Sequence, residues 1–209
     1  MKNSLSLFLS FLLFSPLFFA SLFLPLTPSF SQDLDPQPMP FHVYKDASSS
    51  ENHYIPSGWM GDHKDIEMNL NCRTTPYEGA ACIKFTYKAT GSQGENWAGI
   101  YFLHPTDNWG MLDGGYNLSK AAKLLFYARG EKGTEVISEF KAGGINGGKY
   151  TDSASASIFN IALTQDWKQY TIDLQGQDLS RIIGGFCWSA DKERNPNGMT
   201  FYLDDIRYE

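Results

Sequence analysis

Short apolar runs, separated by Gly, Asn, Asp and Pro, recur along the chain from residue 41 to the end. In ACIKFTYK (81–88), every second residue from Ile83 to Tyr87 is apolar and the residues between them are polar, which is the period of a half-buried strand. About ten such runs, with no convincing amphipathic helix among them, predict an all-β antiparallel β-sandwich. The predicted strands are FHVYK (41–45), DIEMNL (65–70), ACIKFTYK (81–88), WAGIYFL (97–103), KLLFYA (123–128), EVISEFK (135–141), ASIFNI (156–161), KQYTIDL (168–174), IIGGFCW (182–188) and TFYLDDIRY (200–208).

The last of these runs carries two acidic residues, Asp204 and Asp205, inside an apolar strand. A regular strand would point its two apolar halves to opposite faces, whereas a β-bulge at the acidic pair shifts the phase by one and restores both halves to the core side. A bulge also turns carboxylates sideways, where they suit a hard cation such as Ca²⁺. A solvated sheet edge that discourages strand pairing explains the same residues equally well.

The N-terminal segment differs from the rest of the chain. Residues 1–31 hold one basic residue, Lys2, followed by an uncharged run of Leu, Phe and Ser, with Ser29 and Ser31 at the −3 and −1 positions of a cleavage site before Gln32. This pattern is typical of a secretory signal peptide. A membrane anchor is the alternative, because the run approaches the roughly 20 residues that a span needs, but Pro16 interrupts it. We expect export, to the periplasm or the extracellular space, with no membrane association after cleavage.

Residues 32–40 then read as a short Pro-rich leader, and residues 41–209 as one domain with a sizeable core. The chain has 17 basic and 23 acidic residues, a formal charge of −6, and removal of the leader with Lys2 makes the charge one unit more negative. This balance argues against nucleic acid and anionic membranes as partners. All 5 Trp and all 11 Tyr lie after residue 31, so the exported part is rich in aromatic surface.

The three cysteines are Cys72, Cys82 and Cys187. Cys72 and Cys82 bracket a short loop, RTTPYEGAA, and in an oxidising compartment the simplest interpretation is a disulfide that closes it. A metal site is the sharper alternative, but no second Cys or His pair has suitable spacing. We expect Cys187 to be a small buried side chain.

Several segments, taken in order, resemble a known group of proteins. They are FHVYKD…HYIPSGWMGD, WAGIYFL…NWG, GGYNLSKAAKLLFYARG, EVISEFKAGGI, LTQDWKQYTIDLQGQDLSRIIGGFCW and TFYLDDIRYE. Together they look like carbohydrate-binding modules of the galactose-binding-like jelly-roll superfamily, with the cellulase-associated family 11 modules as the nearest relatives. The resemblance covers roughly residues 41–209 and implies a jelly roll that binds a polysaccharide or an oligosaccharide.

The resemblance also implies a structural Ca²⁺ held between the start of the first strand region and the last strand. Carried onto this sequence, it implicates Asp46, just past FHVYK, together with Asp204 or Asp205.

A saccharide site needs flat aromatic faces for the C–H side of a sugar ring and a few directed polar groups for its hydroxyls. Trp97 and Tyr101 share parity on one predicted strand, so they are expected to project from the same sheet face. For each aromatic residue, burial in the core is the alternative to a platform. The expected ligand-binding residues are Trp97, Tyr101, His104, Asn108, Trp109, Lys141, Trp188 and Asp191.

An enzyme is less well supported by these residues. A glycoside hydrolase needs two carboxylates flanking a cleft, and Asp204 and Asp205 are adjacent on one strand. EFKAGGI is superficially similar to a strand of the jelly-roll alginate lyases, but the other strands typical of that family are missing. We therefore expect a secreted, monomeric, non-catalytic binding module, β-glucan or another polysaccharide being its ligand. A protein-binding or structural assembly module of the same fold is the main alternative, and a lyase or hydrolase a weaker one.

Overall fold

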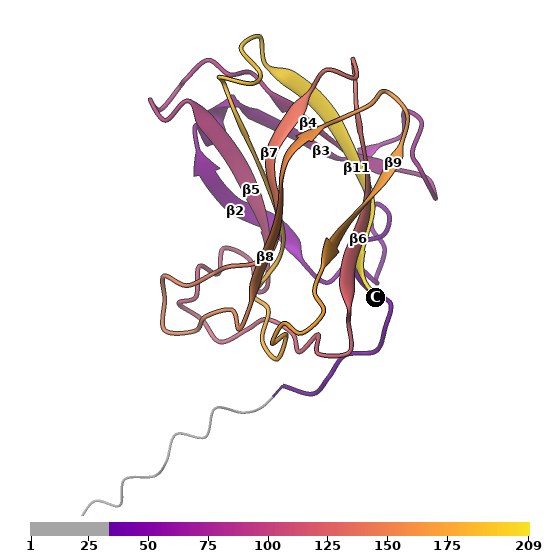
Figure 1. Cartoon of the computed structure of the whole chain (residues 1–209), viewed down its shortest axis with the longest axis vertical. Helices are drawn as coiled ribbons and strands as arrows, with labels where there is room; N and C mark the ends of the chain where they lie inside the picture. Colours follow the sequence, from indigo (N-terminus) through magenta and orange to yellow (C-terminus); the bar gives the residue numbers. More distant parts are fainter. Residues whose placement is uncertain (1–33) are drawn as a thin grey trace, which may run out of the picture. The chain divides into compact units, whose positions relative to one another are not determined.

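The computed structural model describes residues 34–209, so the predicted signal peptide lies outside the described residues. These residues form two antiparallel sheets packed face to face, as Figure 1 shows, and the predicted β-sandwich of jelly-roll type is confirmed. The first sheet has the order β3-β4-β11-β6-β9, with β1 paired to β11. Its strands are β1 (Phe41–Tyr44), β3 (Ile66–Cys72), β4 (Cys82–Tyr87), β6 (Lys123–Gly130), β9 (Lys168–Asp173) and β11 (Met199–Tyr208).

The second sheet has five strands in the order β2-β5-β10-β7-β8. Its strands are β2 (Ile55–Gly61), β5 (Trp97–Leu103), β7 (Val136–Gly143), β8 (Ser155–Ala162) and β10 (Gly184–Asp191). A single 3-10 turn, η1 (His63–Asp65), follows β2. Residues 34–209 hold no helix long and apolar enough to cross a membrane.

Strand β2 is the one strand that the alternation did not predict. Its sequence, IPSGWMG, contains Pro56, Gly58 and Gly61, residues that weaken a strand signal. It lies at the edge of its sheet and pairs only with β5, which is where a proline is tolerated.

The core lies between the sheets and is lined by every second residue of the inner strands. On β4, the apolar residues Ile83, Phe85 and Tyr87 are each 0% exposed, as their alternation predicts. On β10, Trp188 is also 0% exposed, and its ring lies 5.0 Å from that of Phe85. The interpretation of Trp188 as a sugar platform is therefore wrong. The strand register places Trp188 in the core, because its cross-strand partners, Ile100 and Phe140, both face the core.

The predicted β-bulge in the last strand is confirmed. The pairing of β11 with β6 shifts register between Asp204 and Arg207, and Asp205 adopts a positive φ of 44°. The apolar side chains on both sides of the bulge are all 0% exposed, namely Phe201, Leu203, Ile206 and Tyr208. One strand thus presents two apolar halves of opposite phase to the same core.

The predicted disulfide between Cys72 and Cys82 is not found, because all three cysteines are free thiols. Cys72 and Cys82 are direct partners across β3 and β4, but the Cys82 thiol donates a hydrogen bond of 3.4 Å to the Cys72 backbone carbonyl. Burial, with the neighbouring Cys72, raises the pKa of Cys82 to about 12, so its thiol stays protonated. Cys187 is buried, as expected.

Candidate functional site

The five-stranded sheet presents a second set of side chains on the side that points away from the core, and we call this side the outer face. Cross-strand partners share a face, so the register Tyr101–Cys187–Lys141 places these three side chains together. Trp97 and Tyr101 share this side, as their spacing on one strand predicts. The outer face comprises Met60, Trp97, Tyr101, Glu139, Lys141, Ser157, Phe159, Cys187 and Ser189.

A pocket of about 300 Å³ opens at one end of the outer face. It is lined by Tyr101 and Trp109 together with Met111 and residues 144–147. The Trp109 ring meets the Tyr101 ring edge to face, with centroids 5.7 Å apart, and remains 38% exposed. Gly58 makes room for this pair, because a Cβ there would lie 2.7 Å from the Tyr101 Cβ and 3.1 Å from the Trp109 ring. Tyr101 itself is only 6% exposed, and its hydroxyl donates to the Gly143 carbonyl, so the accessible aromatic surface of this pocket is the Trp109 ring.

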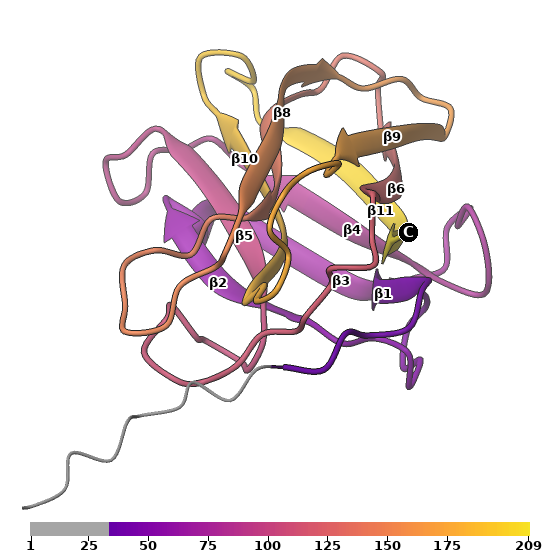
Figure 2. The same cartoon turned by 60° about the horizontal axis from the view of Figure 1, so that its bottom comes forward.

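Two loops build the rim of this pocket, one between β5 and β6 and the other between β7 and β8. Figures 1 and 2 show these loops side by side, and the Tyr150 amide donates to the Gly110 carbonyl between them. Gly110 has a φ of 88° and lies against Gly148, so neither position has space for a side chain. Asn108 is 1% exposed and bonds the backbone of its own loop, which makes it a loop support and removes it from direct contact with a ligand.

Polar groups lie beside the aromatic wall. Lys141 forms an ion pair of 3.0 Å with Glu139, and Glu139 accepts a hydrogen bond of 2.7 Å from the Ser157 hydroxyl. These groups are partly exposed and have spare donors and acceptors for hydroxyl groups. Phe159, which is 61% exposed, adds an apolar surface on the edge strand. Sequence reasoning missed Phe159, although its position directly beside the inward-packing Ile158 is a signal that both faces of this strand carry apolar residues.

The other end of the outer face holds Trp97 and Asp191, which are direct partners across β5 and β10. Asp191 accepts a hydrogen bond of 2.6 Å from Ser138 and is paired with Arg194 at 2.5 Å. Trp97 is partly buried, and the glycine at position 61 leaves space for its ring. Both residues lie on the predicted face, but the Asp191 carboxylate is engaged by Ser138 and Arg194.

His104 lies outside this set. It directly follows β5, and the centroid of its ring lies 4.3 Å from that of Tyr116. Its Nδ1 accepts a hydrogen bond from the Gly115 amide. Burial, with a smaller effect of His53, lowers the pKa of His104. The structure thus gives His104 a packing position beneath the loop and does not bring it to the pocket.

The closing aspartates point to two different environments. Asp204 is 0% exposed and accepts backbone amides from Tyr77 and Glu78 at 2.8 and 3.2 Å. Burial, with the negative charges of Asp46 and Glu78, raises the pKa of Asp204 to about 7. Asp46 accepts the Ala80 amide at 2.9 Å, so it reaches the same loop as Asp204.

Asp205 has different polar partners from Asp204. Its carboxylate is paired with Arg207 and lies 3.6 Å from His42 Nε2. Within residues 34–209, no three His, Cys, Asp or Glu side chains gather into a cluster that could hold a metal ion. The three predicted ligands are therefore divided, with Asp46 and Asp204 on one side of the bulge and Asp205 on the other.

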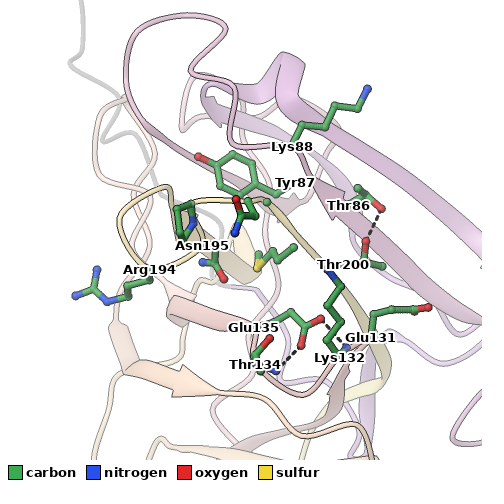
Figure 3. A pocket seen from close by; sticks show the side chains of 14 residues that line it. Thr86, Tyr87, Lys88, Glu131, Lys132, Thr134, Glu135, Arg194, Asn195 and Thr200 are labelled. Atoms are coloured by element: carbon green, nitrogen blue, oxygen red, sulfur yellow. Dashed lines mark hydrogen bonds between the residues drawn. The ribbon is translucent and has the colours of Figure 1, made fainter.

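A larger pocket, of about 410 Å³, lies at the end of the sandwich and is shown in Figure 3. Some of its polar groups bond one another: Thr86 pairs with Thr200, and Glu135 accepts the amides of Lys132 and Thr134. Its aromatic residue, Tyr87, is 0% exposed. The pocket thus lacks an accessible aromatic face, which the pocket beside Trp109 provides.

No protein-family model and no curated protein matches this chain. The fold matches solved structures of carbohydrate-binding modules. The family 30 module of the cellulosomal cellulase Cel9D-Cel44B of Clostridium thermocellum has a TM-score of 0.56 and 15% identity over 82% of this chain and 98% of that chain. Another solved structure of a family 30 module has a TM-score of 0.55 and 15% identity over 82% of this chain and 88% of that chain.

A family 11 module of the cellulosomal cellulase Lic26A-Cel5E of Clostridium thermocellum also aligns, with a TM-score of 0.47 and 13% identity over 84% of this chain and 94% of that chain. At these identities the likeness to the family 30 modules shows the fold alone. The chain thus has the jelly-roll fold that the resemblance implied.

Proposed function

We propose that this protein is a non-catalytic module that binds a polysaccharide on the outer face of the five-stranded sheet. The observation that carries the proposal is the half-exposed Trp109 ring at the wall of an open pocket, with the Lys141–Glu139 pair on the same face. An aromatic face shields the C–H side of a sugar ring, and charged groups with spare hydrogen-bonding capacity recognise its hydroxyls.

The fold supports the same conclusion. The family 30 structures that it resembles are themselves named carbohydrate-binding modules. A β-glucan or another uncharged polysaccharide suits the face, because Lys141 and Glu139 neutralise each other there and the chain as a whole is acidic. Glu139 is held by Lys141 and Ser157, an arrangement suited to binding rather than to proton transfer.

The test is a glycan array probed with the purified protein and with single variants. Trp109→Ala should weaken binding by about tenfold or more, the factor that follows from losing a stacking contact of somewhat over 1 kcal/mol. Trp59→Ala is the matched control, since Trp59 is 40% exposed but sits on the opposite side of its strand from the outer face. Equal retention of the wild type and Trp109→Ala on every bound glycan would contradict the proposal.

A protein-binding role is the second candidate, and one observation favours it. Met111 and Leu112, at the tip of the loop that carries Trp109, are 69% and 57% exposed, and exposed apolar residues of this kind often mark partner surfaces. Absence of glycan binding together with capture of a partner that depends on Met111 and Leu112 would favour this role.

We also propose a structural Ca²⁺ held by Asp46 and Asp204. The Asp204 carboxylate reaches the loop from β11 and the Asp46 carboxylate from the segment after β1. The two repel each other, and a bound divalent ion would neutralise them. Excess chelator should lower the unfolding midpoint of the wild type and have no effect on Asp204→Asn, with the exposed Asp166→Asn as the control that keeps the wild-type response. An unfolding midpoint of the wild type that does not change in chelator, together with no metal found by elemental analysis, would refute the proposed Ca²⁺ site.

Export is a further part of the proposed function, and it rests on the sequence of residues 1–31. N-terminal sequencing of the protein recovered outside an expressing cell should begin at Gln32. Retention of the full N-terminus in a membrane fraction would favour the anchor instead.

A further inference from the structure

A second aromatic surface lies on the six-stranded sheet, on its side away from the core. Tyr127 projects from β6, and Tyr77 reaches it from the loop between β3 and β4. The two rings stack with centroids 3.5 Å apart and an interplanar angle of 14°. Tyr77 remains 43% exposed, so the stacked pair offers an aromatic edge and face to solvent.

Beside this pair lies a buried set of charged groups. Asp205 is 5% exposed, forms an ion pair with Arg207 and lies 3.6 Å from His42. Buried ion pairs contribute little net stability, because desolvation offsets the attraction. Asp205 also holds a positive φ of 44°, a conformation that aspartate tolerates better than most residues other than glycine. The bulge thus fixes this carboxylate beside Arg207 and His42.

The aromatic pair and the charged groups line one pocket of about 300 Å³. Tyr77 and Tyr127 form one wall, and His42, Asp205 and Arg207 form another. This volume is at the lower end of ligand pockets in general. The pocket belongs to the six-stranded sheet, whereas the outer face belongs to the five-stranded sheet, so the two sites are separate.

We propose that this pocket is a second saccharide site that takes one sugar residue of an uncharged glycan. The stacked tyrosines would cover the C–H side of the sugar ring. The Arg207 guanidinium is held by Asp205 and by Glu209, whose carboxylate accepts from the Arg207 Nε at 2.6 Å. The remaining N–H groups of Arg207 and the Asp205 carboxylate present donors and an acceptor suited to two neighbouring hydroxyl groups. Lys45 and Glu78 complete the lining with one charge of each sign, so the site favours a neutral ligand over a uronate. The proposal does not require the outer face to bind.

The experiment measures saturation-transfer NMR binding of the methyl glycosides of glucose, galactose, mannose and xylose. It uses the Trp109→Ala variant as the background, so that the pocket on the outer face no longer contributes. Tyr77→Ala and Tyr127→Ala are each added to that background, one altering the loop and the other a strand. Leu70→Ala is the control for an exposed apolar residue, at 39%, elsewhere on the same sheet. Unfolding midpoints establish that each variant is folded.

We expect the Trp109→Ala background to bind at least one of the glycosides. Adding Tyr77→Ala or Tyr127→Ala should weaken this binding by about tenfold or more, while Leu70→Ala leaves it unchanged. No binding by the background, or binding that neither tyrosine substitution alters, overturns the second site. The two proposals can fail separately. If Trp109→Ala alone abolishes all binding, the outer face binds sugar and the second site does not. If binding depends on Tyr77 but not on Trp109, the second site binds sugar and the outer face does not.

Discussion

Asp152 is expected to make the stability of this protein depend on pH, and it does so at the rim of the pocket beside Trp109. Its carboxylate accepts the Ile145 amide at 2.9 Å and the amides of Ile183 and Gly184, so it ties the β7–β8 loop to the start of β10. Burial raises the pKa of Asp152 from 3.8 to about 6, and these three amide bonds oppose the shift only in part.

The sign follows from proton binding in the two states. A carboxyl group whose pKa is higher in the folded protein binds its proton more tightly there, so its contribution to stability is greatest below the unfolded pKa and is lost as the pH rises through about 6. A difference of about two pKa units corresponds to at most about 3 kcal/mol in the free energy of unfolding. The loss should fall between pH 4 and pH 7.

The assay is urea unfolding of the wild type and Asp152→Asn at several pH values across that range. The asparagine cannot titrate, so the difference in the free energy of unfolding between the two proteins should change by up to about 3 kcal/mol from pH 4 to pH 7. The wild type should become less stable relative to Asp152→Asn as the pH rises. Other titrating groups cancel in this difference, and the exposed Asp166→Asn serves as the control. A difference that stays constant within about 0.5 kcal/mol across the range would refute the reasoning.

Three further changes test the packing. Trp188→Ala, which empties a fully buried site against two phenylalanine rings, should cost about 3–5 kcal/mol in urea unfolding, and a cost under about 1 kcal/mol would contradict its core position. Gly58→Ala places a Cβ 2.7 Å from the Tyr101 side chain and should lower the free energy of unfolding by about 1–3 kcal/mol. Gly147→Ala, where a Cβ has nothing within 4 Å, should be nearly neutral. Equal unfolding midpoints for the two variants would refute this expectation. Tyr208→Phe removes a buried hydrogen bond of 2.7 Å to a backbone carbonyl and should lower the free energy of unfolding by about 1–3 kcal/mol. Tyr87→Phe should change it little, because the Tyr87 hydroxyl has no partner among the described residues. A lower melting temperature for Tyr87→Phe than for Tyr208→Phe would contradict this order.

Much of the fold could be predicted because a strand repeats every two residues. The alternation in ACIKFTYK and the change of phase at Asp204 and Asp205 are both local, and local spacing is enough to predict a strand or a bulge. Strand β2 was not predicted because its proline and glycines interrupt the alternation. These residues are tolerated because β2 is an edge strand, which only the sheet order shows.

The site was harder to predict because β5 and β10 carry apolar or aromatic residues on both faces. WAGIYFL has Ile100 on one face and Tyr101 on the other, and the sequence does not say which of them faces the other sheet. The same ambiguity placed Trp188 on the surface in the sequence interpretation, and the cross-strand register placed it in the core.

The sequence by itself determined that this chain is built of strands, where the last strand breaks its phase, and that Trp97 and Tyr101 share a side. Only the tertiary structure decided which side faces solvent, that Trp109 stands beside Tyr101, and that Asp205 pairs with Arg207. The physical reason is that alternation along a strand is a local property, whereas burial and pairing depend on which distant strands lie alongside, and that order is set by the packing of the whole core.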